Sequence, residues 1–449
     1  MSCFLLWIFQ SPTRIAFNWY FWGAEEGRGE TLGGNTEEPQ QIEAEITDVS
    51  AGSRHTFLIE ADGTVQAAGF IESDSGYKGH LGLGPSKTRC EGREIWSGLC
   101  EEKNFVLEPV TTVVDADGKK VDAPPFRHAY AGVGVASDSG AMHALLISEN
   151  GKAYLSGNNN KGQLCLGNLD PVDYFHEVKG VDNVVLGAVG EDFTLLVTES
   201  GQVYGCGSND VGQLGEGPEL ALSNVPIEIK GDAGDINGIT DVATGLGFAI
   251  YLNGETGEVW GSGSNIYGQL CAFTEGNPKI FLPQVRPMIE QSTGPINTFD
   301  NRDNSFLLFV KFTFQIIFKG VTDEKVIQVE ASRESAYFLF ENHVARSCGR
   351  NDEGQLGNGD FINTSEEEPI VQVDLNEKIV RLGSGPSSQS VFFIGEDGVW
   401  ASGLNDRFQL GIGEIGSVTK PVPVKFSGPV EIQFVSSSGS HTVANGRSL

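Results

Sequence analysis

A short glycine-rich motif recurs along this chain and constrains its fold more than any other feature. Five copies contain the pattern Gly-x-Asn-x-x-Gly-Gln-Leu or a one-residue variant of it. These copies lie in the ranges 156–164, 205–215, 261–270, 347–357 and 402–411, with a weaker form at 79–82 and a damaged seventh at 22–33. Repetition of one unit predicts an array of similar supersecondary units rather than several unrelated domains.

Each copy of the motif follows a similar series of short apolar runs and turns. Before the copy that ends at Leu214, the runs 184–189 and 193–197 are separated by a turn, and a third run leads into the motif. Such a series predicts antiparallel β-strands. The motif leucines Leu164, Leu214 and Leu270 are 50 and 56 residues apart. Four-stranded units of about 50 residues that must stack to bury their faces are typical of a β-propeller.

The two ends of the chain each carry part of one repeat. The beginning holds the late part of a unit, around 21–23, and the end holds the early part, 430–443. Together they make one further blade, which closes the ring and removes exposed edge strands. We therefore predict an all-β fold, a seven-bladed β-propeller, with residues 18–449 as a single domain. Residues 1–17 are expected to be an N-terminal extension, and a mispredicted start codon would explain it.

Two insertions interrupt the repeat period. The first lies near 85–125 and is expected to form a surface loop; its acidic stretch 115–118 lacks the later ligands of a calcium loop. The second lies near 291–326 and includes 306–318, a run of low charge and high β-propensity. Two interpretations of this run stay open, a buried extra strand or an intron translated as protein.

The charge of the chain favours some partners over others. Acidic residues outnumber basic ones by 60 to 30, which gives a formal net charge of −30. Nucleic-acid affinity comes largely from Lys and Arg, so direct DNA binding is disfavoured and a basic protein is the better electrostatic match. Solubility of a large surface would explain the same charge. The sequence has no P-loop, dinucleotide fingerprint or metal-ligand spacing, so no cofactor and no metal are expected.

The cysteines follow the repeat. The seven cysteines are odd in number and show no Cys-x-x-Cys spacing. Cys206 and Cys348 occupy one repeat position, and Cys165 and Cys271 occupy another, where other copies have Gly. We interpret both positions as core sites and expect reduced thiols in a reducing compartment.

The repeat resembles that of the RCC1 (regulator of chromosome condensation) family. The resemblance rests on the motif above, on Gly201-Gln202-Val203-Tyr204-Gly205 and on Gly52-Ser53-Arg54-His55-Thr56, and it covers about residues 18–445. It implies guanine nucleotide exchange on the small GTPase Ran, which binds to one propeller face. The resemblance places acidic and His residues of that face in loops before the innermost strands, near a short protruding wedge. The basic N-terminal tail used for chromatin docking is absent.

The same resemblance implies a set of residues that contact the GTPase. Carried onto this chain, they are Asp192, Glu191, Asp170, Asp138, His143, Glu26 and Glu334. No catalytic residue is expected, because an exchange factor acts by preferential binding to one state of its GTPase. Loop solvation and turn capping are the competing interpretation of each acid. His55, His143 and His441 share one repeat position, which favours a structural hydrogen bond between strands.

Two other functions remain as alternatives. An RCC1-like interaction scaffold without exchange activity would use the same fold. A propeller lyase or hydrolase would require a cluster of perturbed acids in a closed pocket. We expect a monomer that is not attached to a membrane and that lies in the nucleus, the cytoplasm or both, with the nucleus favoured by the family resemblance alone.

Overall fold

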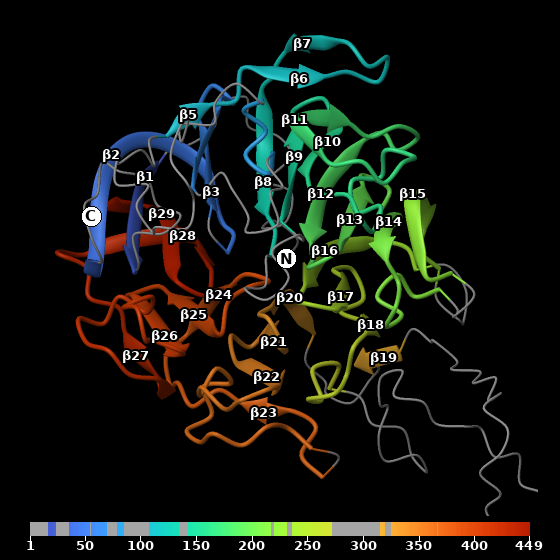
Figure 1. The fold of residues 1–449 in the computed structure, drawn as a ribbon. Helices are drawn as coiled ribbons and strands as arrows, with labels where there is room; N and C mark the ends of the chain where they lie inside the picture. The colour runs from blue at the N-terminus through green and yellow to red at the C-terminus, as the bar shows by residue number, and fades with distance from the viewer. Residues whose placement is uncertain are drawn as a thin grey trace, which may run out of the picture.

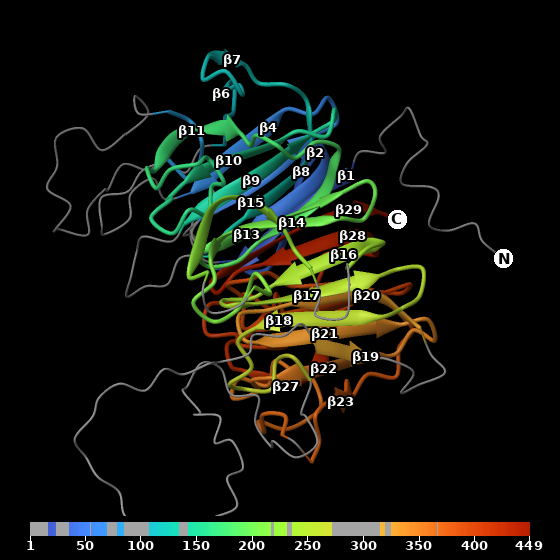
Figure 2. The same cartoon turned by 90° about the vertical axis from the view of Figure 1, so that its right-hand side faces the viewer.

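The computed structural model describes residues 17–23, 36–53, 55–69, 79–84, 107–133, 142–216, 220–230, 236–271, 315–318, 325–365 and 367–449. Within these ranges the regular structure consists of β-strands, without a helix. The strands form sheets that are arranged radially around a central axis (Figure 1). In the side view, the strands of successive sheets lie one above another as blades (Figure 2). The predicted seven-bladed β-propeller is confirmed.

Five blades are separate sheets, in each of which four strands run from the innermost to the outermost in chain order. They consist of β8 (Phe126–Ala131), β9 (His143–Ser148), β10 (Ala153–Gly157) and β11 (Val172–Glu177); β12 (Val184–Val189), β13 (Phe193–Thr198), β14 (Val203–Ser208) and β15 (Leu222–Glu228); β16 (Ile239–Thr244), β17 (Phe248–Asn253), β18 (Val259–Gly263) and β19 (Gln315–Phe318); β20 (Val326–Ala331), β21 (Ser335–Phe340), β22 (Ala345–Gly349) and β23 (Val371–Gln372); and β24 (Ile379–Gly383), β25 (Ser390–Gly395), β26 (Val399–Gly403) and β27 (Val418–Pro423).

The other two blades share one continuous sheet, which closes the ring. Its order is β28 (Val430–Ser437), β29 (His441–Ser448), β1 (Phe17–Gly23), β2 (Thr36–Ala51), β3 (His55–Glu60), β4 (Val65–Gly69) and β5 (Glu108–Pro109). Trp22 on β1 pairs with Thr442 on β29, so the first and the last described strands lie side by side. The long β2 pairs with β1 through its first half and with β3 through its second half. The predicted blade built from both chain ends is thus present.

The hydrophobic core lies between neighbouring blades. On β13, Phe193 and Leu195 pack in a cluster with Tyr251 of the next blade, whereas Leu196 packs in a cluster with Leu145 of the preceding blade. This alternation follows from the two-residue period of a strand. All six side chains of β13 are buried. Burial of apolar area contributes about 25 cal/mol per Å², so each blade is stabilised by both of its neighbours.

The recurrent motif forms the turn after the third strand of a blade. In five copies, the asparagine Oδ1 accepts a hydrogen bond from the backbone N–H of the motif leucine. The pairs are Asn159–Leu164 (3.0 Å), Asn209–Leu214 (2.9 Å), Asn265–Leu270 (2.8 Å), Asn351–Leu356 (2.9 Å) and Asn405–Leu410 (3.0 Å). The leucines are at most 2 % exposed. The side-chain amide thus closes the turn and directs the leucine into the core.

The described parts of the two insertions form strands. Contrary to the expected surface loop, β6 (Thr112–Val114) runs parallel to β11 at the edge of its blade, and β7 (Lys120–Asp122) pairs with β6. The Asp115 Oδ1 accepts hydrogen bonds from the N–H groups of Asp117 (3.0 Å) and Lys119 (2.8 Å), which closes the turn between these strands. In the second insertion, β19 pairs with β18 as the outermost strand of its blade. The rest of the run 306–318 lies outside the described residues.

Four cysteines form two disulfide bonds, so the expectation of reduced thiols is wrong for them. Cys165 is bonded to Cys206, and Cys271 is bonded to Cys348, with Cα–Cα separations of 5.5 and 5.6 Å. Each bond joins the motif turn of one blade to the third strand of the next. The two repeat positions that hold cysteine therefore face each other across a blade boundary, a proximity that arises only when the repeats stack. The three remaining cysteines lie outside the described residues.

Candidate partner-binding face

The loops between the first and second strands of all blades lie at one end of the propeller, which we call the loop face. Their described parts are 52–53, 132–133, 190–192, 245–247, 332–334, 384–389 and 438–440. Backbone hydrogen bonds join several neighbouring loops. The N–H of Glu191 donates to the carbonyl of Leu246 (3.4 Å), and the N–H of Leu246 donates to the carbonyl of Arg333 (3.0 Å). The N–H of Arg333 continues the series to the carbonyl of Ser388 (2.8 Å).

Asp192 and Glu191 lie partly exposed in the loop between β12 and β13. The Asp192 Oδ1 accepts a hydrogen bond from the Nε2 of Gln163 in the preceding blade (3.3 Å), and the Asp192 carbonyl accepts the N–H of Ser208 (2.8 Å). The close approach of this carbonyl requires glycine at 207, because a Cβ on Gly207 would lie 2.2 Å from the oxygen. The two acids lie in the loop after the innermost strand β12. The family resemblance had instead placed such acids in loops before the innermost strands.

A lysine partly neutralises this corner of the loop face. The Lys161 Nζ lies 3.0 Å from the Oδ2 of Asp210, and both side chains are exposed to solvent, by 38 % and 54 %. The hydrogen bond to Asp210, followed by the charges of Asp210 and Asp192, raises the pKa of Lys161. The ammonium group thus lies within electrostatic range of Asp192. Because the pair is exposed, it contributes little to stability.

Glu334 lies on the loop face within an ion-pair network. The Arg350 guanidinium contacts the carboxylates of both Glu334 and Asp352, and it lies 5.2 Å from the ring centre of Tyr267. The hydrogen bond to Asp352, and then that to Glu334, raises the pKa of Arg350. The Glu334 side chain is 14 % exposed. A partner that bound Glu334 would have to displace Arg350.

His143 forms a hydrogen bond between blades. Its side chain is 0 % exposed, and its Nε2 lies 2.9 Å from the Oγ1 of Thr194 in the next blade. The Thr194 hydroxyl has one hydrogen and donates it to the carbonyl of Gln163 (2.8 Å), so Nε2 of His143 must be the donor. His441 makes the same contact with Thr56 (2.9 Å). This geometry supports the structural interpretation of the repeated histidine, and a buried His143 can affect partner binding only through its loop.

His55 holds the same repeat position but has no such bond. Both of its ring nitrogens are buried without a hydrogen-bond partner in the described part of the chain. Ala144 occupies the position that Thr194 has in the following blade, so the accepting hydroxyl is missing. The ring centre of His55 lies 5.0 Å from that of His80. Burial, and then the neighbouring histidines, holds the pKa of His55 well below its usual value, so the ring is neutral.

Asp170, another predicted site residue, lies in a different connection of the chain from Asp192. Asp170 is exposed in the connection that precedes β11, where its N–H donates to the Oδ1 of Asn168 (2.9 Å). Val172, at the start of β11, pairs with Gly157 at the end of β10, which places Asp170 on the outer part of the loop face. Asp138 and Glu26 lie outside the described residues.

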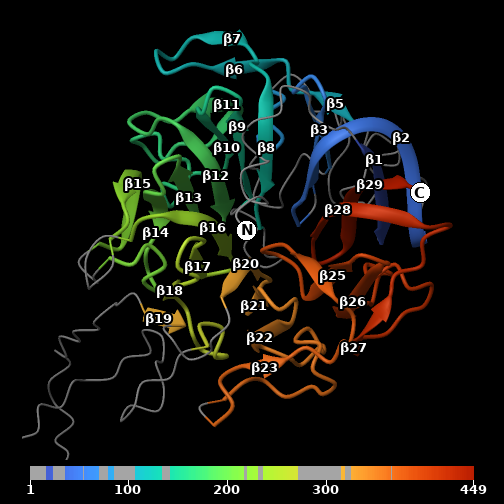
Figure 3. The same cartoon turned by 180° about the vertical axis from the view of Figure 1, so that it is seen from behind.

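The propeller axis contains a cavity of about 280 Å³, lined by residues from all seven innermost strands or the loops that follow them. These strands surround the axis in the views from both ends (Figures 1 and 3). One equivalent position follows the irregularity in each strand, and it holds Asp48, His128, Leu186, Asp241, Gln328, Arg381 and Phe434. The Oδ2 of Asp48 accepts the N–H of Ala129 (3.1 Å), and the Oδ2 of Asp241 accepts the N–H of Val329 (3.0 Å). Both acids thus join neighbouring blades.

Two acids beside this cavity have pKa values above the ordinary ones. Burial, and then the charge of Asp241, raises the pKa of Glu330 to about 8. Burial also raises the pKa of Asp241 to about 6, against the opposing effect of backbone N–H groups and Arg381. The sequence analysis missed these residues. The identical stretches Ile-Thr-Asp-Val at 46–49 and 239–242 were the available signal for Asp241. In the part of the chain that the structure describes, no group of three or more His, Cys, Asp or Glu side chains is placed to hold a metal ion.

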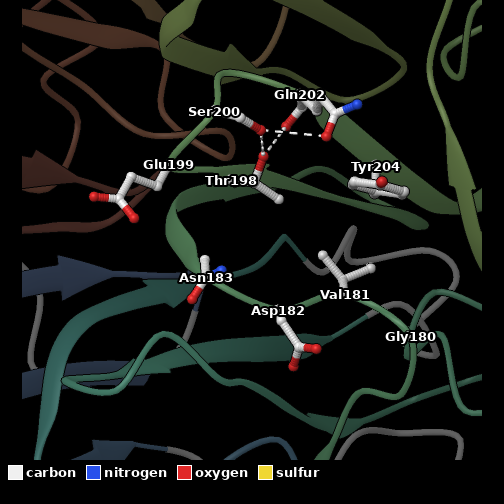
Figure 4. Close-up of a pocket in the computed structure, with 9 residues that line it drawn as sticks. All are labelled: Gly180, Val181, Asp182, Asn183, Thr198, Glu199, Ser200, Gln202 and Tyr204. Carbon is white, nitrogen blue, oxygen red and sulfur yellow. Dashed lines mark hydrogen bonds between the residues drawn. The ribbon is translucent and has the colours of Figure 1, made fainter.

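A second cavity, of about 390 Å³, lies at the opposite end of the blades (Figure 4). It is lined by turn residues between β11 and β12 and between β13 and β14. The hydroxyls of Thr198 and Ser200 are hydrogen-bonded to each other (2.9 Å), and Ser200 donates to the Oε1 of Gln202 (3.2 Å). The carboxylate of Asp182 pairs with the Nζ of Lys152 (2.6 Å). The side chains of Thr198, Ser200 and Asp182 are thus engaged within turns and an ion pair, and this cavity lies at the opposite end of the blades from Asp192.

Comparison with known families agrees with the repeat and the fold. Two family models described as Regulator of chromosome condensation (RCC1) repeat match residues 200–252 and 396–444, and residues 184–213. The Regulator of chromosome condensation of Xenopus laevis is 26 % identical over 423 residues, which cover 93 % of this chain and 74 % of that protein. The chain carries RCC1 repeats. Asp192 and the motif turn at Gly212 lie inside the matched repeats.

Solved structures also resemble this propeller. Human WBSCR16 superposes with a TM-score of 0.67 at 18 % identity, over 97 % of this chain and 100 % of that one. Prp20p from Saccharomyces cerevisiae superposes with a TM-score of 0.66 at 15 % identity, over 98 % of this chain and 93 % of that one. At these identities the similarity establishes the shared fold. The part of the chain that is described has no helix long and apolar enough to cross a membrane.

Proposed function

We propose that this RCC1-repeat protein binds a Ran-like small GTPase through its loop face and accelerates release of the bound nucleotide. The relative from Xenopus laevis aligns with 93 % of this chain, including the blade that carries Asp192. The structure of Prp20p is reported together with its binding to Gsp1p and histones, and yeast RCC1 (Prp20) is also known bound to Kap60. These relatives support a protein-binding propeller without bond-making chemistry, placed in the nucleus or cytoplasm.

The observation that carries the proposal is the fixed placement of Glu191 and Asp192 at one corner of the loop face. The Gln163 Nε2 holds the Asp192 carboxylate, and the backbone of Glu191 is hydrogen-bonded to the loop at Leu246. Loops that are already ordered lose little conformational entropy when a partner binds. Two partly exposed acids on such a loop provide a preorganised surface for a basic protein segment.

Exchange then follows from differential affinity. A factor that binds the nucleotide-free GTPase more tightly than the nucleotide-bound form shifts the population toward the empty state. Carboxylates suit this role because the nucleotide site of a small GTPase contains a lysine and a magnesium ion that hold the phosphates. Glu191 and Asp192 could attract that lysine or compete for the magnesium region. Asp170, Asp138, Glu26, His143 and Glu334 are the other proposed contributors to this face.

The proposal is tested by the rate at which fluorescent GDP leaves Ran in the presence of this protein. The wild-type protein should accelerate release, and Asp192→Ala should reduce the acceleration by about tenfold, the effect of losing 1.4 kcal/mol of differential binding. Asp182→Ala is the matched control, because Asp182 is an exposed acid at the opposite end of the blades. It should leave the rate unchanged.

Folding must be checked alongside the exchange rate. Each variant should retain the wild-type melting temperature within about 2 °C, since surface substitutions change stability little. Equal losses in Asp192→Ala and Asp182→Ala would show that the loop face is not the site. Absence of acceleration by folded wild-type protein would contradict the exchange activity itself.

A binding scaffold without exchange activity is the second candidate. The observation that favours it is the state of two proposed contact residues. Glu334 is held by Arg350, and His143 is buried in a hydrogen bond to Thr194. Fewer side chains are then available to a GTPase than the family resemblance implies. Calorimetric binding of nucleotide-free Ran without faster GDP release would support the scaffold.

A further inference from the structure

One pair of equivalent positions recurs at six blade boundaries, and cysteine fills both members of a pair or neither. The first member follows the motif leucine, or its equivalent, and the second lies on the third strand of the next blade. The pairs are Gly82 and Ser156, Cys165 and Cys206, Gly215 and Ser262, Cys271 and Cys348, Gly357 and Ser402, and Gly411 and Trp22. If these cysteines were only small core residues, they would have no reason to occur in matched pairs.

The backbone at the first position makes cysteine an unusual choice there. The glycines Gly82, Gly215, Gly357 and Gly411 have φ between +66° and +69°. Cys165 and Cys271 adopt the same left-handed conformation, with φ of +58° and +48°. A side chain in this region costs about 1 kcal/mol relative to glycine. Among the six boundaries, a residue other than glycine occupies this left-handed position only where the facing residue is also cysteine. This pattern indicates that the disulfide bond is the reason for cysteine at this position.

The side chain at the second position has a hydrogen-bond acceptor nearby whether it is a serine or a cysteine. At one of the boundaries without cysteines, the Ser262 hydroxyl donates to the carbonyl of Gln213 in the preceding turn (2.9 Å). The Sγ of Cys206 lies 3.4 Å from the equivalent carbonyl of Gln163, and the Sγ of Cys348 lies 3.5 Å from that of Gln269. A thiol at either place can therefore donate the hydrogen bond that Ser262 makes. The reduced form therefore keeps a hydrogen bond between the blades at this position.

We propose that the pairs Cys165–Cys206 and Cys271–Cys348 are reversible redox locks between blades. On oxidation by a small-molecule disulfide, the thiolate of one cysteine attacks a sulfur of that disulfide and releases one thiol. The second cysteine, as thiolate, then attacks the mixed disulfide, forms the bond between blades and releases the second thiol. Two electrons pass from the cysteine pair to the small disulfide, and the two protons are taken up by the released thiolates. Reduction by a thiol reverses both steps.

The first lock lies next to the loop face. Gln163, whose carbonyl contacts both the Cys206 sulfur and the Thr194 hydroxyl, also holds the Asp192 carboxylate through its side chain. The bond at Cys165 is two residues from Gln163 and restrains the same turn. The redox state of this pair therefore sets the rigidity of the turn that positions Asp192. This restraint is independent of which partner the loop face binds.

The test uses the full chain with Cys3, Cys90 and Cys100 replaced by Ser, equilibrated with reduced or oxidised glutathione while folded. Differential alkylation and peptide mapping should show both pairs as thiols in the first sample and as the two bonds in the second. The melting temperature of the oxidised sample should be higher by about 4 °C or more, because cross-links restrict the unfolded chain.

The matched control is built from the other boundaries of the same protein. A variant with Cys165→Gly, Cys206→Ser, Cys271→Gly and Cys348→Ser has glycine and serine at both places, as at Gly215 and Ser262. Its melting temperature should not respond to glutathione. Absence of the mapped bonds after oxidation would overturn the proposal. Equal melting temperatures of the reduced and oxidised samples of the protein that keeps both cysteine pairs would overturn it as well. Bonds that reduced glutathione cannot open in the folded protein would show permanent cross-links and would also overturn it.

Discussion

The Nε2 of His143 donates a hydrogen bond to the Oγ1 of Thr194 across a blade boundary, at 2.9 Å. The hydroxyl passes its own hydrogen to the carbonyl of Gln163 (2.8 Å), so one threonine satisfies two buried polar groups. His55 lacks the equivalent contact because Ala144 faces it. The same repeat position thus has the hydrogen-bond relay at His143 and lacks it at His55, so the contribution of the relay to stability can be measured.

Removal of the Thr194 hydroxyl should destabilise the protein. Thr194→Val keeps the shape of the side chain but leaves the Nε2–H of His143 without an acceptor. A buried polar group left without its partner costs about 1–3 kcal/mol. Denaturation by urea should show this loss. Thr256→Val, at an exposed threonine, is the control and should change the free energy of unfolding by less than about 0.5 kcal/mol. Equal effects of the two changes would contradict the relay.

The complementary change should add the missing relay at His55. Ala144→Thr places a hydroxyl where Thr194 has one, next to the unpaired ring of His55. The new hydrogen bond should stabilise the fold by about 1 kcal/mol. The gain should be absent when His55 is first replaced by Phe, so the comparison of single and double variants isolates the bond. A loss of stability in the His55 background would show that the added methyl group is too large for this core position.

The stability of the protein should depend on pH through Glu330. Its folded-state pKa of about 8 lies above the ordinary value of 4.5, so the folded protein keeps a proton that the unfolded chain loses between these two pH values. Unfolding therefore becomes more favourable as the pH rises from 5 to 8, and this penalty is absent below the ordinary pKa.

Glu330→Gln should remove that penalty. The variant should gain stability relative to wild type as the pH rises, by at least about 1 kcal/mol at pH 8, the free energy of a pKa shift of one unit. At pH 4 to 5 the two proteins should be nearly equal. Urea midpoints measured across this range provide the check. A difference in stability between the two proteins that is the same at all pH values would show that Glu330 is not protonated in the folded protein.

A side chain at 207 should disturb the loop that carries Asp192. Gly207 has φ of +106°, and a Cβ there would lie 2.2 Å from the Asp192 carbonyl. Gly207→Ala should therefore cost about 2 kcal/mol or more. Gly180→Ala is the matched control, because Gly180 has φ of +83° but nothing within 4 Å of its Cβ position. Gly180→Ala should lower the free energy of unfolding by about 1 kcal/mol, because only the left-handed backbone conformation is unfavourable there. Equal melting temperatures of the two variants would exclude the clash.

Much of the propeller could be predicted because its information is local and repeated. The motif that ends at Leu214 predicts its own turn, since Asn209, Gly212 and Leu214 are within a few residues of one another. The count of such units, with a partial unit at each end, predicts the ring and its closure by the two ends of the chain. The structure closes it through the pairing of β1 with β29, in which Trp22 pairs with Thr442. Asp192 could be singled out as a site candidate through the family resemblance of its loop.

The pairing of side chains between blades could not be predicted in the same way. The bond between Cys165 and Cys206, the ion pair of Glu334 with Arg350 and the proximity of Asp241 to Glu330 each require the curvature of the ring and the offset between stacked sheets. The reduced thiols expected from the repeat positions were wrong for this reason. Facing positions separated by 41 residues in sequence come together only in the assembled propeller.

The sequence by itself therefore determined the blade, the number of blades and the closure of the ring, because turn chemistry and strand alternation act over a few residues. The tertiary structure decided which of the acids, histidines and cysteines are exposed and which are engaged. Burial, hydrogen bonding and disulfide formation at those residues depend on contacts between neighbouring blades, and these contacts exist only after the blades pack.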